Sequence, residues 1–139
     1  MTYADKREIK MKKIILIISL VFLLAGCTAP DQKGNDFRQI SMEEAASIME
    51  EENDYILLDV RTESEFRERH IPNAINIPNE EIGTEEIESL PDKEQLILVY
   101  CRSGNRSKQA SAKLVELGYS NIVEIGGIND WTGETVSEE

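Results

Sequence analysis

One cysteine lies in a segment whose residue types suit a reactive sulfur, Tyr100-Cys101-Arg102-Ser103-Gly104-Asn105-Arg106-Ser107. Thiolate is the nucleophilic form of cysteine, and cations, converging backbone N–H groups and helix N-termini all stabilise it. The segment offers all three, because it holds two arginines and a glycine and leads into a helical pattern. We therefore interpret Cys101 as a nucleophile, in preference to an inert buried cysteine.

The elements on either side of this loop must hold it in place. Residues 95–100 (QLILVY) form a short apolar run, typical of a buried parallel strand. Ala110, Leu114 and Leu117 then recur at helical spacing over residues 107–117, and Gly118 can end that helix in the left-handed conformation. A strand, loop and helix in this order place Cys101 at the carboxyl edge of a sheet, where α/β proteins bind their ligands.

Strand and helix patterns alternate from residue 37 onward, which predicts an α/β fold with a mostly parallel five-stranded sheet and helices on both faces. The expected strands are residues 37–40, 55–60, 74–77, 95–100 and 122–125. Ser41 with Glu44, and Thr62 with Glu65, predict capping boxes, the first for a helix that runs to about Glu51. A weaker helix is expected at residues 85–90.

Three blocks of this sequence resemble the rhodanese sulfurtransferases. Residues 101–107 resemble the active-site loop of that family. Residues 58–61 (LDVR) and 70–78 (HIPNAINIP) resemble its second signature, and Gly126-Gly127 with Trp131 resembles its closing residues. The blocks occur in the family's order and span about residues 37–131. Arg69 and Asn73 stand where the family has glycine, and Asn73 is expected to keep a turn with positive φ.

The resemblance implies a sulfurtransferase that needs no metal and no other cofactor. Cys101 would take a sulfane sulfur from a donor such as thiosulfate or polysulfide, hold it as a persulfide, and pass it to a thiol or to cyanide. The persulfide would bind to the loop residues Arg102, Ser103, Gly104, Asn105, Arg106 and Ser107. Arg102 and Arg106 would also orient an anionic donor, and Arg106 has a second role open to it as a brace of the loop.

Other residues of these blocks are expected to serve the structure. Asp59 and Arg61 flank a strand end, and we expect a structural ion pair there, with support of the loop as the alternative. His70 is interpreted as part of a structural motif rather than as a base, since a preformed thiolate needs none. Trp131 is expected to pack either as core or as a lid near the loop.

Two other classes of function share part of this pattern. Cysteine phosphatases and arsenate reductases also hold a thiolate in an anion-binding loop, but their signature separates cysteine from arginine by five residues. Cys101 and Arg106 are separated by four, which favours a cradle for one sulfur atom. A non-catalytic rhodanese-like module that carries sulfur or binds a partner is the second alternative, and the presence of Cys101 and both arginines disfavours it.

The N-terminal region reads as an export signal. Lys12 and Lys13 precede a twelve-residue apolar run, residues 14–25, which is too short to span a bilayer. Residues 24–27 (LAGC) resemble the bacterial lipobox, so Cys27 is expected to carry acyl chains such as palmitate and to anchor the protein to the outer face of a membrane. The expected organisation is a signal peptide over residues 1–26, with Met11 as an alternative start, a tether over 27–36, a rhodanese-like domain over 37–133 and an acidic tail over 134–139.

Charge and cysteine count limit the partners of the mature protein. The chain has a net charge of −12, and loss of residues 1–26 removes five basic and two acidic residues, which leaves −15. Such an acidic body is unsuited to nucleic acid, whose phosphates attract clustered Lys and Arg. With Cys27 lipidated, Cys101 has no partner for an intrachain disulfide, and we expect a monomer stabilised by its hydrophobic core.

Overall fold

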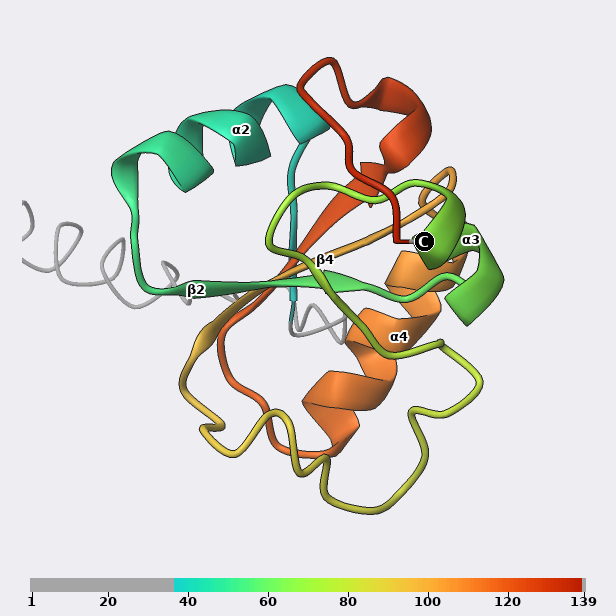
Figure 1. Ribbon diagram of the computed structural model, residues 1–139. Coiled ribbons are helices and arrows are strands. Elements are labelled where there is room, and N and C mark those ends of the chain that lie inside the picture. Colours follow the sequence, from blue (N-terminus) through green and yellow to red (C-terminus); the bar gives the residue numbers. More distant parts are fainter. Residues whose placement is uncertain (1–36, 139) are drawn as a thin grey trace, which may run out of the picture. The chain divides into compact units, whose positions relative to one another are not determined.

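The computed structural model describes residues 37–138, which form an α/β domain. Its elements are β1 (Arg38–Gln39), α2 (Met42–Glu51), β2 (Tyr55–Asp59), α3 (Glu63–Glu68), β3 (Ile75–Asn76), β4 (Leu96–Cys101), α4 (Asn105–Glu116), β5 (Ile122–Gly127) and a 3-10 turn, η1 (Ile128–Asp130). The strands form one sheet in the order β1-β5-β4-β2-β3, and every pair is parallel (Figure 1). The predicted five-stranded α/β architecture is confirmed, with a sheet that is parallel throughout.

The sheet has a hydrophobic core on each face, because successive side chains of a strand point to opposite sides. Val99 and Cys101 of β4 pack in one core with Leu114 of α4, whereas Leu98 and Tyr100 pack in the other core with residues of α2. Helices α2 and α4 therefore cover opposite faces of the sheet (Figure 1). Burial on both sides explains why β4 reads as a continuous apolar run.

Two short helices begin where their capping residues predict. The Ser41 side chain accepts from the N–H of Glu44 at 3.2 Å, and the Glu44 carboxylate accepts from the N–H of Ser41 at 2.8 Å. Thr62 and Glu65 make the same reciprocal pair at the start of α3, at 3.3 and 3.1 Å. Both predicted capping boxes are confirmed, and each satisfies two backbone donors at a helix start.

Turn residues behave as their types require. Asn73 has a φ of 65° and Gly118 a φ of 91°, so both predicted left-handed positions are confirmed. Arg69, which stands in place of a glycine, has a φ of −168°. That value is ordinary extended backbone, so the substitution introduces no backbone strain.

The helix predicted for residues 85–90 is wrong, because this segment is a loop. Three of its six residues are glutamates that would repel one another on a single helical turn, and Pro91 disfavours helical geometry in Leu90. Too few residues remain to repay the cost of starting a helix. Buried Ile82 and Leu90 anchor the loop instead, and one turn bond joins the N–H of Leu90 to the carbonyl of Ile87 at 2.9 Å.

Two boundaries near the cysteine differ from the prediction. Helix α4 begins at Asn105, two residues earlier than expected, and β4 extends through Cys101. Gly104, with a φ of 99°, makes the turn between them. The connection is thereby shortened to three residues, and the last residues of the predicted loop become the first turn of α4.

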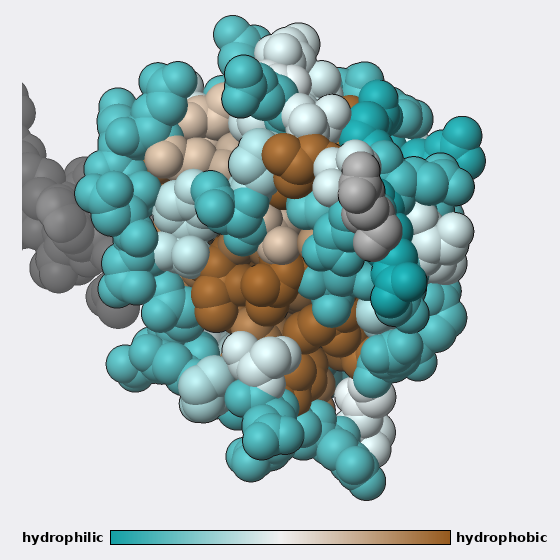
Figure 2. All heavy atoms as spheres, in the orientation of Figure 1, coloured by the Kyte–Doolittle hydropathy of each residue, from teal (hydrophilic) through white to brown (hydrophobic). Residues whose placement is uncertain are grey.

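The surface of the domain is largely hydrophilic in the view of Figure 2, with an apolar area near its centre. Across residues 37–138, no helix combines the length and apolarity needed to cross a membrane. Part of the expected acidic tail is attached to the domain, since Val136 pairs antiparallel with His70 and the N–H of Glu138 donates to the carbonyl of Arg67 at 2.9 Å.

Candidate active site

The three-residue connection after β4 wraps around the sulfur of Cys101. The sulfur accepts a hydrogen bond from the N–H of Gly104 at 3.1 Å, and its thiol lies 3.4 Å from the Ser107 hydroxyl oxygen. Cys101 is only 1 % exposed, at the carboxyl end of the central strand. The strand order reverses beside β4, which is where open α/β sheets bind their ligands.

Glycines let the loop pass close to β5. A Cβ on Gly127 would overlap the carbonyl group of Arg102 and the Cα of Ser103, so no other residue fits there without moving the loop. The N–H of Asn129 donates to the Arg102 carbonyl at 3.3 Å and fixes that approach. The Gly-Gly block therefore serves the active-site loop directly, although it lies about 25 residues further along the chain.

The surroundings of Cys101 favour its ionised form. Burial raises the pKa of the thiol, but hydrogen bonds from the Ser107 side chain and from the N–H groups of Ser107, Ser103 and Gly104 outweigh it, so the net pKa is lowered. These donors belong to the start of α4 and to the turn before it. The loop thus provides the cluster of backbone donors that the sequence predicts.

The two arginines of the loop differ in their surroundings. Arg106 forms a two-pronged ion pair with the carboxylate of Glu65 in α3, at 2.7 and 2.9 Å. Hydrogen bonding to Arg106 lowers the pKa of Glu65 to about 2. Arg102 is exposed and makes no ion pair within residues 37–138. The guanidinium of Arg106 therefore joins α4 to α3 through its ion pair, whereas the guanidinium of Arg102 is exposed to solvent.

Ser103 and Asn105 are exposed, while Ser107 is fully buried against a carboxylate that the sequence analysis missed. The Ser107 hydroxyl donates to the Oε1 atom of Glu124 in β5 at 2.5 Å. The available signal was one charged residue within the apolar strand pattern of residues 122–125. The sequence places Glu65 in a capping box and, with Phe66, in the block that resembles the family's second signature, but nothing in it indicates the pairing with Arg106.

The Asp59 and Arg61 pair braces the ends of β2 and α3. Arg61 donates to Asp59 at 2.6, 3.0 and 3.1 Å, and to the carbonyl of Arg69 at 2.6 Å. Both side chains are buried. This geometry matches a structural ion pair at the same edge of the sheet as the cysteine.

His70 and Trp131 likewise make structural contacts. The His70 ring stacks on Phe66 at 3.8 Å, and its Nδ1 atom lies 2.8 Å from the Phe66 carbonyl oxygen. Trp131 is half-buried against the core beneath α2, and its ring N–H donates to the carbonyl of Glu134 at 2.8 Å. The groups that pair with these two rings belong to α3 and to the C-terminal segment rather than to the cysteine loop.

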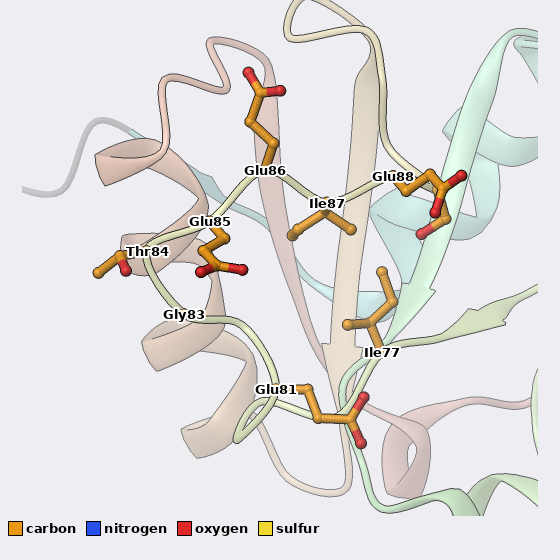
Figure 3. A pocket seen from close by; sticks show the side chains of 9 residues that line it. Ile77, Glu81, Gly83, Thr84, Glu85, Glu86, Ile87 and Glu88 are labelled. Atoms are coloured by element: carbon orange, nitrogen blue, oxygen red, sulfur yellow. The ribbon is translucent and has the colours of Figure 1, made fainter.

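A hollow of about 750 Å³ lies away from the sulfur and is unsuited to an anionic donor (Figure 3). Ile77 and residues of the 81–89 loop line it, including Glu81, Glu85, Glu86 and Glu88, and no residue of the cysteine loop contributes. Among residues 37–138, no group of three or more His, Cys, Asp or Glu side chains is arranged to hold a metal ion. We therefore assign the candidate site to the loop around Cys101.

The candidate site is thus a buried thiol that backbone donors surround at the carboxyl edge of a parallel sheet. The chain belongs to the rhodanese-like domain family, whose pattern it matches over residues 41–134. Residues 11–28 match a prokaryotic membrane lipoprotein lipid attachment site, which contains Cys27. Cys27 and the predicted signal peptide and tether lie outside the described residues.

Several relatives carry the name sulfurtransferase. The chain is 37 % identical over 73 residues to the thiosulfate sulfurtransferase PspE of Escherichia coli, a match that covers 52 % of this chain and 70 % of PspE. It is 34 % identical over 94 residues to a sulfurtransferase of Allochromatium vinosum, covering 67 % of this chain and 86 % of the relative. One longer relative is matched over only 25 % of its own length.

A solved structure shares the fold at similar identity. A rhodanese with anions from E. coli superposes with a TM-score of 0.55 and 36 % identity, over 60 % of this chain and 98 % of that one. The domain described here therefore has the rhodanese-like fold.

Proposed function

We propose that this protein is a sulfurtransferase that moves a sulfane sulfur from a small donor to a thiol or to cyanide through a persulfide on Cys101. The observation that carries the proposal is the buried sulfur, which the N–H of Gly104 approaches to 3.1 Å beside the start of α4. Fixed donors of this kind stabilise a thiolate before the reaction and a persulfide anion after it. The names of the relatives support the same class of activity.

With thiosulfate as donor, the Cys101 thiolate attacks the outer sulfur. A new S–S bond forms to Cys101 while the S–S bond of thiosulfate breaks, and sulfite leaves with the bonding electron pair. An acceptor thiolate or cyanide then attacks the outer sulfur of the persulfide and releases the Cys101 thiolate. Each half-reaction is a displacement at sulfur, and neither calls on a metal or another cofactor.

The two arginines contribute in different ways to this reaction. Arg102 is exposed at the loop and unpaired within residues 37–138, so it is the side chain suited to attract an anionic donor. The charge of Arg106 is balanced by Glu65, so its part is to hold the first turn of α4 against α3. Ser103 and Asn105 are also exposed in this loop and belong to the segment proposed to bind the donor and the persulfide.

We further propose that the domain works outside the cytoplasm, held at a bacterial membrane by lipid on Cys27. The match of residues 11–28 to a lipid attachment site supports this. The nine residues after Cys27 extend at most about 30 Å, which would keep the domain close to the membrane face.

Intact-mass measurement after exposure to thiosulfate tests the function. We expect a gain of one sulfur atom on Cys101, one sulfite released per sulfur gained, and conversion of added cyanide to thiocyanate. The Cys101→Ser variant should fold but neither gain sulfur nor turn over. Sulfur loading without turnover would indicate a carrier module instead, and hydrolysis of a phosphate ester would indicate the phosphatase alternative.

A further inference from the structure

Glu124 is a buried carboxylate beside the sulfur that the transfer steps leave without a role. It is 2 % exposed and lies on the same face of the sheet as Cys101. Its Oε1 atom accepts from the Ser107 hydroxyl at 2.5 Å and from the N–H of Gly126 at 2.9 Å. Since the Cys101 thiol lies 3.4 Å from the same hydroxyl, Cys101, Ser107 and Glu124 form a continuous hydrogen-bonded chain.

The hydroxyl of Ser107 has a single hydrogen, and two groups compete for it. At 2.5 Å from a carboxylate, the contact has the length of a charge-assisted O–H···O⁻ bond, so the hydrogen lies toward Glu124. The carbonyl of Gly126, at 3.3 Å, is the weaker acceptor. While its hydrogen lies toward Glu124, Ser107 can accept from a Cys101 thiol. It can give the thiolate the stabilising hydrogen bond described above only when Glu124 no longer takes that hydrogen.

A thiolate on Cys101 and a carboxylate on Glu124 would place two anions on either side of one hydroxyl. Arg106 is the cation on α4 that faces Cys101, and its charge is already shared with Glu65. Arg102 is exposed, and the strand on the other side of Glu124 contributes neutral Gln39. Burying like charges together is costly, so an arrangement with one shared negative charge is favoured.

We propose that Glu124 is a positioning residue that takes up the proton of Cys101 through Ser107 when the thiolate forms. The thiol proton moves to the Ser107 oxygen while the hydroxyl proton of Ser107 moves to Glu124 Oε1. One S–H bond breaks and one O–H bond forms, and the three groups together keep a charge of −1. The carboxyl then donates to Ser107, and Ser107 donates to the thiolate, so every hydrogen bond in the chain is kept.

This inference deepens the proposed function, because it concerns the same cysteine, but the proton transfer needs no sulfur donor. It predicts that the Cys101 thiolate forms in two steps as the pH rises. Between those steps the chain holds one proton, and the fraction of thiolate does not change with pH. A cysteine without such a partner gives a single step.

The test is the rate at which iodoacetamide alkylates Cys101 as a function of pH, followed on the Cys101 peptide by mass spectrometry. We expect two rises separated by a plateau in the unmodified protein. Glu124→Gln should lose the plateau and give one rise. Glu116→Gln, which removes an exposed carboxylate at the far end of α4, should keep the two-step profile.

Substitutions of Ser107 provide a second, independent test if Glu124→Gln does not fold. Ser107→Ala breaks the chain and should give one rise, whereas Ser107→Thr keeps a hydroxyl and should restore the plateau. A single rise in the unmodified protein, or a plateau that survives in Glu124→Gln or Ser107→Ala, would overturn the proposal. A failure of sulfur transfer would leave these alkylation profiles unchanged, so the two hypotheses are tested separately.

Discussion

We predict that Glu65→Gln destabilises the domain by removing the charge that holds Arg106. The variant isolates the ion pair, because glutamine can still accept the capping hydrogen bond from the N–H of Thr62. A pKa lowered from 4.5 to about 2 corresponds to at most about 3.4 kcal/mol. The two side chains remain 26 % and 27 % exposed, and water screens their attraction, so we expect a loss of about 1 kcal/mol at pH 7.

The effect should depend on pH in a defined direction. Because the folded-state pKa of Glu65 lies below its ordinary value of 4.5, the stabilisation is fully present above pH 4.5 and is lost as the pH falls through about 2. The stability gap between the unmodified protein and Glu65→Gln should therefore close over this interval. At neutral pH the variant should melt about 4 to 8 °C lower, as 1 kcal/mol implies for a domain of this size.

Urea denaturation at pH 7 and at pH 2.5, combined with Arg106→Gln and the double variant, measures the coupling directly. Glu63→Gln is the matched control, since its pair with Arg67 is 69 % and 61 % exposed and should contribute less than about 0.5 kcal/mol. The reasoning is refuted if Glu65 and Arg106 show no coupling at pH 7, or if the gap is as large at pH 2.5 as at pH 7.

Three further outcomes are expected. Gly127→Ala should lower the free energy of unfolding, measured by urea denaturation, by about 3 kcal/mol, because a Cβ there overlaps the backbone of Arg102. Gly83→Ala, with open space around it, should lower it little. Equal losses would contradict the close approach of the loop to Gly127. Arg102→Ala should lower kcat/KM for thiosulfate roughly tenfold and change kcat/KM for an uncharged sulfane donor by no more than about twofold. Lys108→Ala, which removes an exposed charge on α4, is the control. Equal losses on both donors would assign Arg102 to the loop rather than to the substrate. Cys27→Ser should release the protein from the membrane or leave it unprocessed, and intact-mass analysis of the membrane fraction decides, since an unmodified Cys27 in the parent protein would count against the anchor.

Local sequence signals predicted the elements that carry the cysteine. The apolar run of β4 and the two capping boxes follow from residue type and spacing alone, and each is present in the structure. The left-handed Asn73, also present, was expected because an asparagine stands at a glycine position of the family. The segment 85–90 misled the prediction because its apolar spacing is helical while its charges and Pro91 oppose a helix. A prediction from apolar spacing alone does not include the unfavourable contributions of the charges and of the proline.

Contacts between distant segments could not be read from the sequence. The pairing of Arg106 with Glu65 joins residues 41 positions apart, and the contact of Ser107 with Glu124 joins residues 17 positions apart. Each depends on which face of the sheet or helix a side chain occupies once the strands are ordered β1-β5-β4-β2-β3. The sequence therefore predicted the position of Cys101 among backbone donors, but not the carboxylates that surround the site.

The nearly complete burial of Cys101 makes its thiol an internal reporter of motion in the domain. Because Cys101 is only 1 % exposed, a bulky maleimide can reach its sulfur only when the loop, the start of α4 or β5 moves aside. Its labelling rate therefore measures the population of locally opened molecules, as amide hydrogen exchange does for a backbone group. Comparison with a small alkylating reagent on the same protein separates the reactivity of the sulfur from the frequency with which its surroundings open.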